Sequence, residues 1–128
     1  MIFMAHSGLR YLVLLAGAIA VVLALAALRP GPTSGAGRAA IHAFRLFVIV
    51  LDVQVLLGIG VAFTRPFVPM YMGHIVMMVL AVAMGHVLSV QLKRRAPGQR
   101  SPALILAGAG IPLLLVVGGI LALARPVL

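Results

Sequence analysis

Four histidines are the residues of this chain best suited to chemistry. They are His6, His42, His74 and His86, and each falls within or beside a long apolar stretch. Neutral imidazole binds metal ions and haem iron, and it can also relay protons near neutral pH. The 128 residues include no cysteine, so disulfides, thiolate catalysis and Cys-bound metal clusters are excluded.

Among the other polar side chains in the apolar stretches, Arg10, Asp52 and Gln54 stand out, and Asp52 is the only acidic residue of the chain. An ionisable side chain costs roughly 2.5–3.5 kcal/mol at the centre of a bilayer, and a neutral amide is also unfavourable there, so each of these is a candidate functional residue. For Asp52 the open interpretations are proton relay, quinone binding, orientation of a histidine, and pairing with a cation such as Arg10.

Composition requires membrane helices to position these residues. The chain is 64% hydrophobic and 9% charged, whereas soluble domains are about 45–50% apolar and about 25% charged. A chain of this length cannot bury so much apolar surface in a core of its own. A soluble globular domain is therefore excluded, and the lipid bilayer is the expected surrounding.

Four apolar stretches are each close to the roughly 20 residues that cross a bilayer as a helix. They cover residues 8–28, 46–63, 67–92 and 103–124, with short links of Gly, Pro and basic residues between them. Short links place consecutive helices antiparallel. We predict an all-α fold: one domain over residues 1–128, built as an antiparallel bundle of four transmembrane helices.

Basic residues predict the orientation of this bundle. Those in or beside the first and third links are Arg29, Arg38, Arg45, Lys93, Arg94, Arg95 and Arg100, and those on the opposite side are Arg10, Arg65 and Arg125. The side richer in Lys and Arg stays in the cytoplasm, so both termini are expected outside. The same rule explains the net charge of +9, and we expect no nucleic-acid partner.

Depth sorts the histidines into two pairs. At 1.5 Å per residue, His74 lies about 10 Å below the outer end of its span and His86 about 18 Å deeper. His6 is then level with His74 near the outer face, and His42 is level with His86 near the inner face. Two imidazoles from facing helices can hold the iron of haem b from both sides.

Neighbouring residues suit such a haem. Gly17 shares a helix face with His6 and would leave room for the macrocycle. Arg10 or Arg65 could pair with the haem propionates. Plainer interpretations also stand, because His6 and His42 could contact lipid headgroups, and His74 and His86 could donate hydrogen bonds between helices.

Three short motifs lie in the first three spans. They are HSGLRYLVLL at residues 6–15, DVQVLLG at 52–58, and GHIVMM at 73–78 with Gly85-His86 further on. Together they resemble a family of short four-helix bacterial membrane proteins labelled cytochrome b-like. The resemblance implies haem b, ligated by His6, His74 and His86, in the bacterial cytoplasmic membrane. Asp52 departs from the family pattern, because similar proteins commonly have His there.

These observations predict an integral membrane protein that carries electrons to other membrane redox proteins, with no further catalysis of its own. It would bind one haem b through His6 and His74, or two if His42 and His86 hold a second. A quinone is a further candidate cofactor, and a second copy of the chain a further partner. The alternatives are a haem-free accessory subunit of a respiratory or photosynthetic complex, and copper handling by Met70, Met77 and Met78 beside His74.

Overall fold

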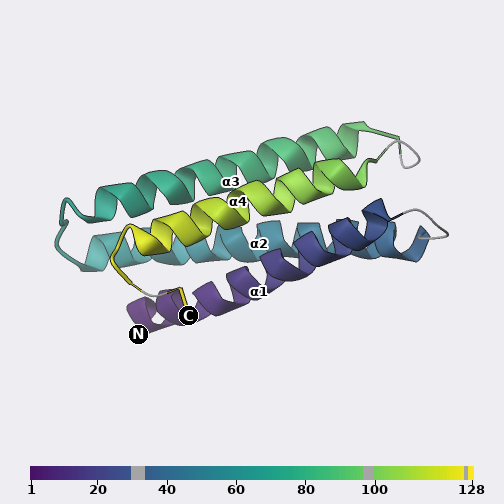
Figure 1. Ribbon diagram of the computed structural model, residues 1–128. Coiled ribbons are helices and arrows are strands. Elements are labelled where there is room, and N and C mark those ends of the chain that lie inside the picture. The colour runs from purple at the N-terminus through teal and green to yellow at the C-terminus, as the bar shows by residue number, and fades with distance from the viewer. Residues whose placement is uncertain (30–33, 97–99, 126) are drawn as a thin grey trace.

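Four long helices make up the computed structural model, which describes residues 1–29, 34–96, 100–125 and 127–128 (Figure 1). The helices are α1 (Ile2–Leu28), α2 (Ser34–Thr64), α3 (Tyr71–Arg94) and α4 (Pro102–Leu121). All four are long and apolar enough to cross a membrane. The predicted all-α bundle of four transmembrane helices is thereby confirmed. The centres of two predicted links, residues 30–33 and 97–99, lie outside the described residues.

The helices differ in extent from the apolar stretches that predicted them. α1 begins at Ile2 rather than at residue 8, and α2 at Ser34 rather than at residue 46. An apolar stretch ends at the first polar side chain, whereas a helix continues as long as its backbone groups bond to each other. α3 begins four residues later than predicted, because a turn closed by the bond from the Tyr71 amide to the Val68 carbonyl precedes it.

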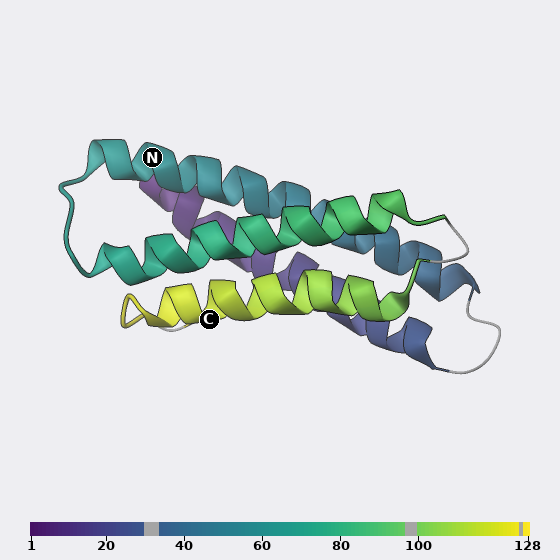
Figure 2. The same ribbon diagram turned by 90° about the horizontal axis from the view of Figure 1, so that it is seen from above.

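Consecutive helices run antiparallel, so both termini lie at the same end of the bundle (Figures 1 and 2). α1 packs along α2 and α4, and α3 packs along α4, whereas α2 and α3 share a much smaller contact. α1 and α3 therefore face each other across the diagonal of the bundle. Only side chains that point into its interior can join them.

Small residues let α1 approach its neighbours closely. Ala16, Ala20 and Ala24 are buried along one face of α1, which is the spacing typical of close helix contacts in membranes. At Gly17 an added Cβ would lie 2.7 Å from Leu113 of α4 and 2.9 Å from Phe47 of α2. The prediction that Gly17 leaves room for a macrocycle is therefore wrong, because side chains from two other helices fill that space.

Candidate functional site

The structure brings the two predicted outer histidines together. His6 of α1 and His74 of α3 have ring centroids 6.3 Å apart, with their ring planes at 90°. Their helices lie on a diagonal of the bundle, so the two rings meet in its interior. His6 is only five residues from the N-terminus, and the contact agrees with the similar depth that helical rise predicts for the two residues.

Two reciprocal hydrogen bonds hold His6 against α2. The amide Nε2 of Gln54 donates to the backbone carbonyl of His6 over 2.9 Å, and His6 Nδ1 donates to the backbone carbonyl of Gln54 over 3.1 Å. Gln54 is only 6% exposed, so this lock lies inside the helix contact. A carbonyl can only accept, so His6 carries its proton on Nδ1 and its lone pair on Nε2.

His74 is held in the same manner by α4. Its Nδ1 donates to the backbone carbonyl of Gly119 over 3.0 Å. An added Cβ at residue 119 would lie 3.4 Å from that same nitrogen, so glycine lets the ring sit close to the helix backbone. The structure records no hydrogen bond to Nε2 of His6 or His74 among the residues it describes. Both rings thus have an available Nε2, the arrangement typical of metal-binding histidines.

The spacing of the two rings suits one shared metal centre. Metal–imidazole bonds are about 2 Å long, so two rings on one ion have centroids about 6 Å apart. Within the described ranges there is no group of three or more His, Cys, Asp or Glu side chains that could hold a bare ion. Haem brings four nitrogens of its own and needs only two axial ligands. By the number of ligands that the protein must supply, the pair therefore suits haem better than a free ion.

Two cations lie near the ring of Phe3, one helical turn from His6. The guanidinium carbon of Arg65 is 3.8 Å from the ring centroid of Phe3, and that of Arg125 is 5.8 Å from it. Phe3 precedes His6 by three residues, one helical turn. The sequence predicted Arg65 as a propionate partner but not Arg125, because residue 125 lies near the start of α1 only in the folded chain.

Arg10 has a more local partner. Its Nη2 donates to the hydroxyl of Tyr11 over 2.6 Å, and the guanidinium lies over the same ring. Its Nε is buried without a hydrogen-bond partner in the described part of the chain. The structure does not pair Arg10 with Asp52, which was one of the interpretations left open by the sequence.

The predicted inner histidine pair is not formed. His86 Nε2 lies 2.8 and 3.0 Å from the two carboxylate oxygens of Asp52. His42 is exposed on α2, ten residues from Asp52, which is about 15 Å along the helix. These contacts favour one of the interpretations left open for Asp52, namely that its carboxylate orients a histidine, here His86.

The methionines of α3 serve as packing residues. The terminal methyl of Met78 would be 2.6 Å from a Cβ at Gly119, and that of Met77 would be 3.4 Å from one at Gly118. Met78 is buried in the core, and Met70 is exposed. These contacts favour adaptable packing on α4 over a copper site.

Comparisons with known proteins assign no function to this site. No family model, curated protein or solved structure matches the chain. The resemblance to cytochrome b-like proteins stays a prediction that rests on the short motifs.

Proposed function

We propose that this chain is a membrane-embedded haem b protein that carries electrons, with His6 and His74 as the axial ligands. The observation that supports the proposal most directly is the pair of imidazoles 6.3 Å apart, each with Nδ1 bonded to a backbone carbonyl. The expected setting is the bacterial cytoplasmic membrane, with both termini outside.

The residues of the chain would bind and orient the haem and would take no part in the electron transfer reaction themselves. Bound haem supplies one-electron chemistry. Gln54 and the Gly119 carbonyl fix the orientation of the two rings and, in the neutral imidazoles, leave the lone pair on Nε2. Arg65 and Arg125 supply positive charge that would compensate the propionates.

An optical spectrum tests this proposal. The protein is produced in cells supplied with haem precursors, purified in a mild detergent, and measured before and after dithionite reduction. We expect a Soret band and a sharp alpha band on reduction, with one haem per chain by pyridine extraction. A purified, folded protein without these bands would overturn the proposal and favour the haem-free accessory subunit.

Gly58 leaves room for the His6 ring in its observed position. A Cβ at residue 58 would lie 3.0 Å from Cε1 of His6, so Gly58→Ala should shift the ring by a few tenths of an ångström and strain its bond to the Gln54 carbonyl. We expect about tenfold weaker haem binding, the usual size of such an indirect effect on a ligand. The measurement is haem titration of the apoprotein.

Gly8→Ala is the matched control for this variant, because a Cβ at residue 8 meets nothing within 4 Å. It should bind haem as the unchanged protein does. Equal affinity for haem in the two glycine variants would mean that haem binding does not depend on the observed position of the His6 ring.

The orientation has a test of its own. A reporter inserted after Ala96, just beyond α3, should report cytoplasm, because four of the ten basic residues lie between 93 and 100. A fluorescent protein that matures only in the cytoplasm should be bright there, and alkaline phosphatase should be inactive. The opposite pattern would reverse the predicted orientation.

A further inference from the structure

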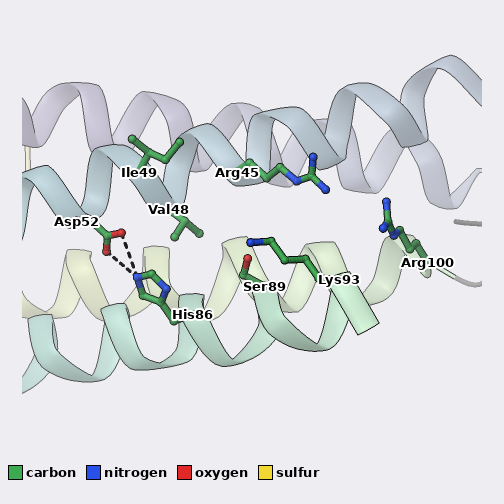
Figure 3. A pocket seen from close by; sticks show the side chains of 8 residues that line it. All are labelled: Arg45, Val48, Ile49, Asp52, His86, Ser89, Lys93 and Arg100. Carbon is green, nitrogen blue, oxygen red and sulfur yellow. Dashed lines mark hydrogen bonds and ion pairs between the residues drawn. The ribbon is translucent and has the colours of Figure 1, made fainter. Parts of the chain in front are cut away.

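A second polar site lies between α2 and α3, away from the His6–His74 pair. It is a pocket of about 520 Å³. Figure 3 shows the hydrogen-bonded Asp52 and His86 at one end of it, and the side chains of Arg45, Lys93 and Arg100 at the other. The proposed haem function uses none of these five residues.

The charged end of the pocket is suited to an anion. Arg45 comes from α2, Lys93 from α3, and Arg100 from the segment just before α4, so three separate parts of the chain bring cations to one place. Arg100 Nε is buried without a hydrogen-bond partner among the described residues. The only carboxylate of the chain, Asp52, lies at the far end and is paired with His86.

Depth in the membrane indicates where the anion would come from. Asp52 is twelve residues from the end of α2 at Thr64, about 18 Å into a hydrocarbon layer of about 30 Å. Arg45 is seven residues further, about 28 Å from that end, which is the level of the opposite headgroups. The cations therefore lie at the headgroup level of the leaflet that the charge distribution predicts to be cytoplasmic.

The pocket lies between two helices that share only a small contact. In the protein alone, the side chains of His86 and Asp52 are 52% and 37% exposed. Bare hydrocarbon against such a pair near the middle of the membrane would be costly. An occupant of the pocket whose polar atoms reach to within one helical turn of His86 would reduce that cost.

We propose that this pocket binds one anionic phospholipid of the cytoplasmic leaflet. Its phosphate would lie among Arg45, Lys93 and Arg100, since basic pockets between membrane helices bind acidic headgroups. Ser89 is four residues deeper than Lys93, about 6 Å, and its hydroxyl is placed to donate to an ester carbonyl. The phosphate and ester groups of a phospholipid are separated by a similar distance.

The apolar side of the pocket favours a lipid over free phosphate. Val48 and Ile49 line the pocket, and Ile49 belongs to the outward face of α2, where it is exposed together with Leu46. Acyl chains leaving the ester groups would continue along this face into the bilayer. The lipid would also fill the gap that α2 and α3 leave between them.

Native mass spectrometry can test the proposal on the full chain in detergent. The probes are phosphatidylglycerol and phosphatidylcholine with identical acyl chains, added at equal concentration. We expect one phosphatidylglycerol to stay bound, at least tenfold preferred over phosphatidylcholine. The triple variant Arg45→Ala, Lys93→Ala, Arg100→Ala should bind phosphatidylglycerol at least tenfold more weakly.

A matched variant removes the same charge from the same side of the membrane but outside the pocket. It carries Arg38→Ala, Arg94→Ala and Arg95→Ala, three exposed residues, and should bind phosphatidylglycerol normally. Circular dichroism of both variants verifies that each is folded. If the pocket variant is unfolded, the single variants Arg45→Ala and Lys93→Ala replace it, and each must weaken binding.

Three results would overturn the proposal. The first is an equal loss of phosphatidylglycerol binding in the two triple variants. The second is retention of phosphatidylcholine to the same extent as phosphatidylglycerol. The third is displacement of the lipid by millimolar inorganic phosphate, which would assign the pocket to the free anion. The haem bands of the same samples are an independent readout, so failure of the lipid proposal and failure of the haem proposal are distinguishable.

Discussion

His74→Ala is expected to abolish the haem spectrum of the purified protein. The substitution removes one of the two imidazoles that face each other across the bundle, and no other His, Asp, Glu or Cys of the described residues joins them. We expect loss of the reduced alpha band and at least a hundredfold weaker haem binding, with the same result for His6→Ala. The measurement is the reduced-minus-oxidised spectrum at equal protein concentration.

His42→Ala is the control, because that ring is exposed and far from the pair. It should retain the full haem content. The fold should survive His74→Ala as well, since one hydrogen bond to the Gly119 carbonyl contributes only about 1 kcal/mol to stability. A His74→Ala protein that keeps the alpha band would show that the iron, if present, has other ligands.

Phe47→Ala is expected to cause a large loss of stability. Phe47 is fully buried and its ring fills the space beside Gly17 on α1. In a membrane the separated helices remain in hydrocarbon, so the lost packing dominates the cost. A cavity of roughly 100 Å³ costs about 2 kcal/mol.

Unfolding in mixtures of dodecyl maltoside and sodium dodecyl sulphate, followed by circular dichroism, measures this difference. Phe63→Ala makes the same chemical change on the same helix at a position that is 87% exposed, so it should change the unfolding free energy little. Equal effects of the two substitutions would mean that α1 and α2 are not packed through Phe47. Because Phe47 also sets the approach of α1, its variant should bind haem more weakly than Phe63→Ala does.

Sequence alone determined the number of membrane helices and the shared level of His6 and His74. Both follow from one-dimensional quantities: hydropathy along the chain defines the spans, and the rise of 1.5 Å per residue sets depth within them. This is why His6 and His74 could be paired before the fold was known. The same reasoning also paired His42 with His86, because it assigned both to the inner part of the bundle.

Only the tertiary structure decided which residue each polar side chain meets. The partner of a polar side chain depends on how each helix is rotated about its axis and on which helices are neighbours. Hydropathy along the chain predicts neither the rotation nor the neighbours when the helices carry so few polar residues. His86 is turned by about 120° from His74 on the same helix, and with α2 beside it the ring reaches Asp52. The bonds of Gln54 to His6, and the convergence of Arg45, Lys93 and Arg100, likewise exist only once the helices have packed.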